Sequence, residues 1–152
     1  MIGVLKSHLS PSPKNILAVR ALNELGESGV TSCLFYDYLP PEFPVEVQTN
    51  MLQKAEAFNF GEIVIADDLI VCQQLVNLVY ASKRYFYVYD LDWGRIDSLR
   101  LDHLKPMLMN DSVELIARSE SHSKIISALF KKPKYIMSNW DSRVLKKIVK
   151  DG

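Results

Sequence analysis

Six short apolar runs recur along the chain, and polar or turn-forming residues separate each run from the next. Runs of this length that are rich in branched and aromatic side chains are typical of β-strands. One of them, EIVIA at 62–66, is almost continuously apolar, which favours a strand buried on both faces of a parallel sheet. The predicted strands are 1–6, 31–36, 62–66, 85–89, 113–117 and 135–137.

Between these runs, apolar residues recur at intervals of three or four, the spacing that places them on one face of a helix. Ser12 is a candidate N-cap for the first helix, with Pro13 at the first helical position. Residues 96–109 are predicted as one short helix or two, with a break near Pro106. The predicted helices are 15–28, 48–58, 69–82, 96–109, 121–130 and 142–150.

This alternation of strands and helices predicts the fold class. It is typical of a single Rossmann-like α/β domain over residues 1–152, with a doubly wound, mainly parallel sheet and helices on both faces. The commonest order of six strands, 3-2-1-4-5-6, would place the topological switch point between the first and fourth predicted strands. Such sheets bind ligands at the carboxyl ends of their strands, so the residues that follow each strand are candidates for a site.

The composition is that of a soluble globular protein, with 48% hydrophobic and 24% charged residues. The 18 basic and 18 acidic side chains cancel, so no general attraction to nucleic acid or to an anionic membrane is expected. No apolar run reaches the roughly 20 residues that span a bilayer, and the N-terminal segment is too polar for a signal peptide. We therefore expect a cytoplasmic protein in which Cys33 and Cys72 are reduced, buried thiols and no metal site forms.

The residues that follow the predicted strands are mostly acids, amides, hydroxyls and histidines. His8, just beyond the first strand, is the candidate general base, because histidine accepts a proton near neutral pH. The alternative is an exposed loop histidine without a role. Lys14 and the N-terminus of the first helix are candidates to hold an anion. The further candidate substrate-binding residues are Asp67, Asp90, Asp92, Trp93, Ser119, Glu120 and Asn139.

Several of these residues also have simpler interpretations. The pairs at 67–68 and 119–120 are of the types that cap helices. Asp90 and Asp92 form a DxD whose side chains point the same way in a strand, so they are either shared ligands of a divalent metal or two turn aspartates. The tyrosines of the YFYVY run at 85–89 share one strand face, where they either stack on a base or sugar or pack against helices.

The sequence patterns of common cofactor and nucleophile sites are absent. The loop after the first strand, SHLSPSPKN, matches neither GxGxxG nor GxxxxGK[ST]. A standard NAD or ATP site is therefore not expected, and we predict no cofactor. The chain also has no GxSxG motif, which argues against a serine nucleophile of the α/β-hydrolase type.

Three segments resemble the N-terminal, acceptor-side domain of retaining GT-B-fold glycosyltransferases, which transfer sugars from nucleotide diphosphates. The segment IVIADDLIVCQQLVNL is similar to the third strand and following helix of those domains, and YFYVYDLDW is similar to their fourth strand. The third segment, which runs from ELIARSESHSKII to KPKYIMSNWD, resembles their closing strand–helix–strand unit. The resemblance covers residues 60–141 well and residues 1–37 loosely.

The resemblance implies a sugar or nucleotide-sugar ligand, with His8 as the acceptor base and with Asp90 and Glu120 positioning hydroxyls. In the family, a second domain carries the nucleotide-sugar site, whereas this chain ends about one helix after Asp141. Its first loop also lacks the glycines that admit the donor phosphate in the family. We therefore expect an acceptor-side domain that does not transfer sugar alone and needs a donor-domain protein partner.

Two hypotheses from other functional classes remain. The helix at 69–79 is apolar almost all round, which favours a non-catalytic interaction module that forms a homo-oligomer through this helix. A signalling domain with a phospho-acceptor pocket would gather acids after the first and third strands. This last hypothesis ranks lowest, because the first strand ends in Ser7 and His8.

Overall fold

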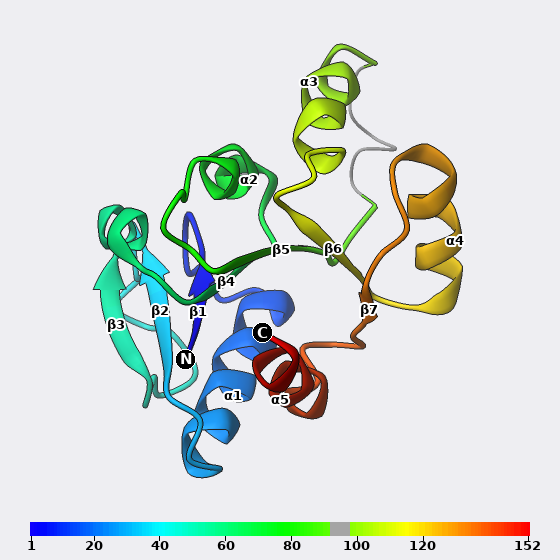
Figure 1. The fold of residues 1–152 in the computed structure, drawn as a ribbon. Coiled ribbons are helices and arrows are strands. Elements are labelled where there is room, and N and C mark those ends of the chain that lie inside the picture. Colours follow the sequence, from blue (N-terminus) through cyan, green and yellow to red (C-terminus); the bar gives the residue numbers. More distant parts are fainter. Residues whose placement is uncertain (92–97) are drawn as a thin grey trace.

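The computed structural model describes residues 1–91 and 98–152, which form a single parallel sheet with helices around it (Figure 1). This confirms the predicted Rossmann-like α/β fold class. The strands are β1 (Ile2–Leu5), β2 (Ser32–Tyr36), β3 (Asn50–Gln53), β4 (Ile63–Ala66), β5 (Lys83–Val88), β6 (Glu114–Ala117) and β7 (Tyr135–Ile136). Within the described residues their order is β3-β2-β1-β4-β5-β6-β7, and every neighbouring pair is parallel.

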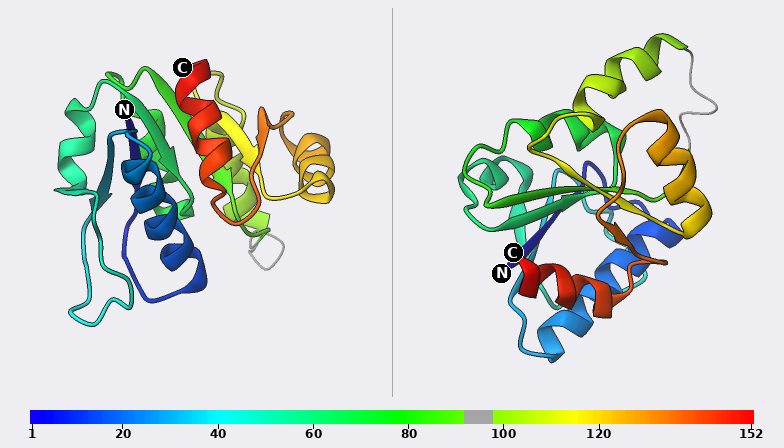
Figure 2. Two further views of the ribbon diagram at one scale, coloured as in Figure 1. Left: turned by 90° about the horizontal axis from the view of Figure 1, so that it is seen from below. Right: turned by 45° about the vertical axis from the view of Figure 1, so that its right-hand side comes forward.

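Helices cover both faces of this sheet (Figure 1). They are α1 (Pro13–Glu27), the 3-10 helix η1 (Lys54–Asn59), α2 (Leu69–Val76), α3 (Ser98–Leu108), α4 (Glu120–Leu129) and α5 (Ser142–Asp151). On one face α1 and α5 lie side by side (Figure 2), and η1, α2, α3 and α4 pack on the other. Because side chains alternate along each strand, each face of the sheet has its own apolar core.

The tyrosines of β5 and its end belong to the core under α1 and α5. Tyr85 and Tyr87 are fully buried, and Tyr89 is nearly so. The Tyr87 ring makes edge-to-face contacts with Tyr89 and with Trp140, at centroid distances of 5.5 and 5.2 Å. Such contacts add to the apolar burial of each ring. The tyrosine row therefore serves mainly to pack the sheet against its helices.

The helix predicted at 48–58 is wrong, because this segment forms the edge strand β3 followed by η1. Met51 and Leu52, together with Ala55 and Phe58, have the spacing of three and four that places apolar residues on one face of a helix. In the structure Met51 and Leu52 point to opposite faces of the sheet, and Met51 packs on one core while Leu52 packs on the other. A strand of this kind needs apolar residues on both faces, so its pattern does not alternate.

This missed strand moves the topological switch point. The third predicted strand, now β4, was expected at a sheet edge, but it pairs directly with β1. The strand order therefore reverses between β1 and β4, not between β1 and the strand at 85–89 as predicted. The sheet keeps the common order of doubly wound folds, with β7 added at the edge beyond β6.

Two predictions about helix ends had different outcomes. The Ser12 side chain accepts a hydrogen bond from the Asn15 N–H, and Pro13 begins α1, so the predicted N-cap is confirmed. The helix predicted at 69–82 is shorter and ends at Val76. The N–H of Asn77 donates to carbonyls of the last turn, and the chain then continues as a turn.

Three further observations complete the fold. Cys33 and Cys72 are free and buried as expected, and burial raises the pKa of each thiol to about 12. The segment around Pro106 forms one helix, α3, and not two. Among the described residues, no helix combines the length and apolarity that crossing a membrane requires.

Candidate functional site

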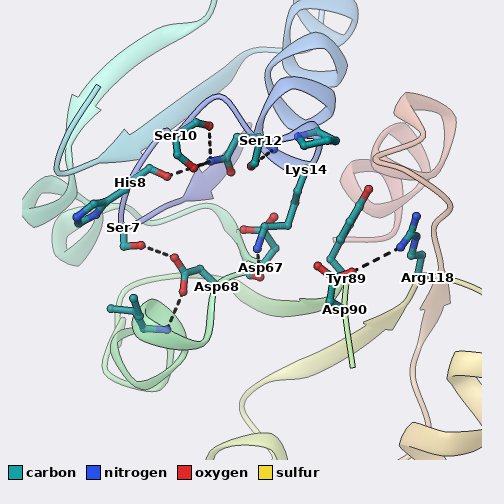
Figure 3. Close-up of a pocket in the computed structure, with 13 residues that line it drawn as sticks. Ser7, His8, Ser10, Ser12, Lys14, Asp67, Asp68, Tyr89, Asp90 and Arg118 are labelled. Carbon is teal, nitrogen blue, oxygen red and sulfur yellow. Dashed lines mark hydrogen bonds and ion pairs between the residues drawn. The ribbon is translucent and has the colours of Figure 1, made fainter. Parts of the chain in front are cut away.

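A cleft of about 710 Å³ opens at the carboxyl edge of the sheet, at the switch point between β1 and β4 (Figure 3). The chain runs in opposite directions from these two strands, which leaves a crevice above their ends. The cleft is bounded by the β1–α1 loop, the first turn of α1, and the residues that follow β4, β5 and β6. Its lining residues are Ser7, His8, Ser10, Ser12, Pro13, Lys14, Asn15, Asp67, Asp68, Ile70, Tyr89, Asp90 and Arg118.

The β1–α1 loop brings hydroxyl groups and Lys14 to one wall of the cleft. The buried Asn15 side chain fixes this loop, because its Nδ2 donates to the carbonyls of His8 and Ser10 at 3.1 and 3.0 Å. The Lys14 Nζ donates to the carbonyl of Asp67 at 3.3 Å, which directs the ammonium across the switch point. The loop is thus held by side-chain hydrogen bonds where related folds often use glycines.

A buried ion pair lies beneath the cleft. The Lys6 Nζ is 2.5 Å from Asp67 Oδ2, and both side chains are almost completely buried. Burial lowers the pKa of Lys6, and the adjacent Asp67 carboxylate offsets only part of this effect. The Lys6 ammonium also lies 5.0 Å from the ring centroid of Trp140, a cation–π contact. The other carboxylate oxygen, Asp67 Oδ1, is buried and has no hydrogen-bond partner among the described residues.

Asp68 connects the cleft to helix α2. Its Oδ1 accepts a hydrogen bond from the Ile70 N–H at 2.8 Å, so it is the N-cap of α2. Its Oδ2 accepts a hydrogen bond from the Ser7 hydroxyl. The free N–H groups at a helix N-terminus stabilise a carboxylate, so the charge of Asp68 is already partly balanced.

The opposite wall is built from the residues after β5 and β6. The Arg118 guanidinium carbon lies 4.4 Å from the Tyr89 ring centroid, and its Nη1 is 3.6 Å from Asp90 Oδ1. Its Nη2 donates to Asn139 Oδ1 at 3.2 Å, and the Tyr89 hydroxyl donates to the same oxygen at 3.4 Å. Figure 3 shows Tyr89 between Lys14 and Arg118, so these two cations belong to different walls.

The structure brings together four of the predicted site residues, His8, Lys14, Asp67 and Asp90, which all line the cleft. His8 lies at its rim: the ring is exposed, 6.3 Å from the Tyr38 ring, and directed away from Lys14 in Figure 3. Asp67 is the buried partner of Lys6, so its accessible surface is small.

Three further predicted residues, Ser119, Glu120 and Asn139, do not line the cleft. The Ser119 hydroxyl accepts a hydrogen bond from the His122 N–H and is the N-cap of α4, while Glu120 is exposed in the first turn of that helix. Asn139 contacts Arg118 and Tyr89. The remaining two, Asp92 and Trp93, lie outside the described residues.

Arg118, Ser10 and Ser12 line the cleft and Lys6 lies beneath it, but none of them was predicted as a site residue. Arg118 directly follows the strand at 113–117, so its position at a strand end was a usable signal. The site residues predicted at strand ends were acids, amides, hydroxyls and histidines, so Arg118 was missed, although Lys14 was predicted at the start of the first helix. Within the described residues, no three His, Cys, Asp or Glu side chains gather as metal ligands would.

Comparisons of the chain with protein-family models, with curated proteins and with solved structures gave no match. The resemblance to GT-B-fold glycosyltransferases therefore stays a prediction from three sequence segments. The strand order and the helix packing show the fold class, whereas a function can be inferred only from the residues of the cleft.

Proposed function

We propose that this chain is a glycosyltransferase-like, acceptor-side domain that binds a sugar-type ligand in the cleft and needs a donor-binding partner for transfer. The observation that carries the proposal is the cleft itself. It lies at the switch point, and it gathers hydroxyls, two cations and carboxylates from four strand ends. Sugars present many hydroxyls, each able to donate and accept, and they bind to surfaces with both kinds of group.

Each wall has a role in this proposal. Asp90 is partly exposed and accepts hydrogen bonds from ligand hydroxyls, as the family resemblance implies. The serine hydroxyls of the β1–α1 loop both donate and accept, and the hydrogen bonds of Asn15 keep the loop in place. A site held in place before binding loses less entropy when the ligand arrives.

His8 is the proposed acceptor base. Its ring is at the rim and open to solvent, where an acceptor hydroxyl and a second protein can both reach it. Proton transfer by a positioned imidazole contributes to catalysis near neutral pH. In the proposed reaction, the partner supplies the nucleotide sugar. The acceptor oxygen bonds to the anomeric carbon while the bond from that carbon to the diphosphate breaks. His8 accepts the proton of the attacking hydroxyl, and the nucleoside diphosphate leaves on the partner.

Calorimetric titration with a neutral disaccharide and with a nucleotide-linked hexose tests the binding. We expect the purified chain to bind the disaccharide, and Asp90→Asn to weaken that affinity about 10-fold through loss of charge-assisted hydrogen bonds. Asp111→Asn, in an exposed turn away from the cleft, is the matched control and should bind as the wild type does. Absence of binding to both sugars would contradict the proposal.

A homo-oligomeric interaction module is the second candidate, and one observation favours it. The adjacent residues Val79 and Tyr80, after α2, are 73% and 68% exposed, which is high for large apolar side chains. The buried residues of α2 face the sheet, whereas Ile70 in its first turn is 71% exposed. Self-association through this helix would therefore use its two ends, Ile70 and the turn at Val79 and Tyr80. Sedimentation of the wild type beside Val79→Ser separates a monomer from an oligomer that depends on this turn.

A further inference from the structure

Arg118 is held in one orientation by neighbours on three sides. The guanidinium carbon lies over the Tyr89 ring, Asn139 Oδ1 accepts a hydrogen bond from Nη2, and Asp90 lies beside Nη1. An arginine side chain loses much rotamer freedom when it binds a ligand, and a guanidinium that is already oriented avoids most of that cost.

One of the residues that orient Arg118, Asn139, lies in a turn with an unusual backbone conformation. Asn139 and Trp140 have φ angles of 48° and 61°, and two consecutive left-handed residues are uncommon, above all at a tryptophan. The burial of Trp140 against Tyr87 and Lys6 stabilises this turn. The turn places Asn139 Oδ1 within hydrogen-bond distance of Arg118. Strained turns of this kind are common at ligand sites.

The charge of Arg118 is available to a ligand. Its pairing with Asp90 spans 3.6 Å, and the two side chains are 37% and 43% exposed. Ion pairs with this exposure contribute little because water screens them, so a ligand anion can replace Asp90 as the partner of Arg118 at low cost. On the facing wall, the Lys14 Nζ has no carboxylate within 4.0 Å among the described residues, and its hydrogen bond is to a carbonyl.

We propose that Arg118 and Lys14 bind an anionic group of the ligand from opposite walls of the cleft, so that the ligand is an acidic or phosphorylated carbohydrate. A phosphoryl or carboxylate group offers two or more oxygens to the guanidinium fork and to an ammonium. The hydroxyls of Ser10 and Ser12 line the same cleft beside Lys14. Asn139 is a positioning residue that acts through Arg118. This inference rests on the proposed sugar-binding function.

The test compares three probes that share one ring: a neutral hexose, its 1-phosphate and the corresponding hexuronate. We expect calorimetry to show at least one anionic probe binding about 10-fold or more tighter than the neutral hexose. Arg118→Gln should remove most of that preference, so that the ratio of the affinities for the anionic and the neutral probe falls by about 10-fold. Which anionic probe binds tighter distinguishes a phosphoryl from a carboxylate ligand.

Further variants separate the roles. Arg118→Lys keeps the charge but loses the fork, so its preference should be intermediate. Asn139→Ala should weaken the anionic probe only while Arg118 is present, so the double variant Asn139→Ala/Arg118→Gln should match Arg118→Gln. If thermal unfolding shows that the Arg118 variants are poorly folded, Lys14→Gln tests the anion site from the facing wall instead. Arg20→Gln, at an exposed position of α1 outside the cleft lining, is the matched control.

The outcomes separate this inference from the proposed function. Equal affinity for all three probes would overturn the inference and leave sugar binding in place. Binding of inorganic phosphate that Arg118→Gln abolishes, without binding of any sugar, would keep the anion site and overturn the function. Binding of none of these probes would overturn both.

Discussion

At the scale of single residues, the buried pair Lys6 and Asp67 is the most consequential charge arrangement in the site. We expect Lys6→Met to lower the free energy of unfolding by about 3–5 kcal/mol, because it leaves the Asp67 carboxylate buried without its cation. Methionine is similar in length and keeps apolar contact with Trp140. Urea unfolding followed by circular dichroism measures the loss.

The double variant Lys6→Met/Asp67→Leu is the control for this prediction. It removes both charges, so most of the lost stability should return, because paired apolar residues often replace a buried ion pair without cost. A single variant within about 1 kcal/mol of the wild type would contradict this account of the pair.

The roles of individual site residues were predictable only in part. His8, Lys14, Asp67 and Asp90 were found because each follows a buried strand or begins a helix, and those positions are visible in the sequence. Asn139 was predicted to bind the ligand, which stays a prediction, and in the structure it also accepts a hydrogen bond from Arg118. That contact depends on how the ends of β5, β6 and β7 lie side by side, which no local pattern encodes.

At the scale of elements, the start of α5 carries a testable pH dependence. Asp141 is the N-cap of α5, and it accepts hydrogen bonds from the backbone N–H and the guanidinium of Arg143. These hydrogen bonds lower the pKa of Asp141 below its ordinary value of 3.8. Between its two pKa values, the unfolded chain binds more protons at this group than the folded chain. The stabilisation is therefore present above pH 3.8 and is lost as the pH falls through the folded-state pKa.

Asp141→Asn tests this sign. Asparagine is also a good N-cap but carries no charge, so the variant should be less stable than the wild type at neutral pH. The difference in melting temperature should shrink as the pH falls below 3.8, and thermal unfolding over a series of pH values measures it. A difference that stays constant, or one that Asp111→Asn shows equally, would count against the role of Asp141.

Most elements were predictable because their apolar periodicity is strong, and β3 shows where that signal fails. The edge strand is short, and its two apolar residues, Met51 and Leu52, pack on opposite faces of the sheet. Adjacent apolar residues fit a helix and a buried strand equally well, and only pairing with β2 decides between them. The C-terminal end of α2 was predicted wrongly for a different reason, because apolar residues continue past Val76 into a turn.

At the scale of the whole molecule, the doubly wound fold follows from the alternation of strands and helices, and the carboxyl edge follows as the place for a ligand. One missed strand was enough to shift the predicted switch point from β5 to β4. The true switch point places the β1–α1 loop opposite Asp67 and Asp68, and the cleft lies between them. The site therefore depends on strand order more than on any motif.

The central claim is that this cleft binds a sugar-type ligand, and a two-dimensional amide NMR titration of the wild-type chain tests it most directly. With the hexose 1-phosphate and the neutral hexose as probes, the account predicts saturable shifts at the amides of the lining residues Ser7, Ser10, Lys14, Asp68, Asp90 and Arg118. Shifts confined to other surfaces, such as the hollow between α2 and α3 around Gln73 and Met107, would contradict it, and so would the absence of any shift at saturating sugar.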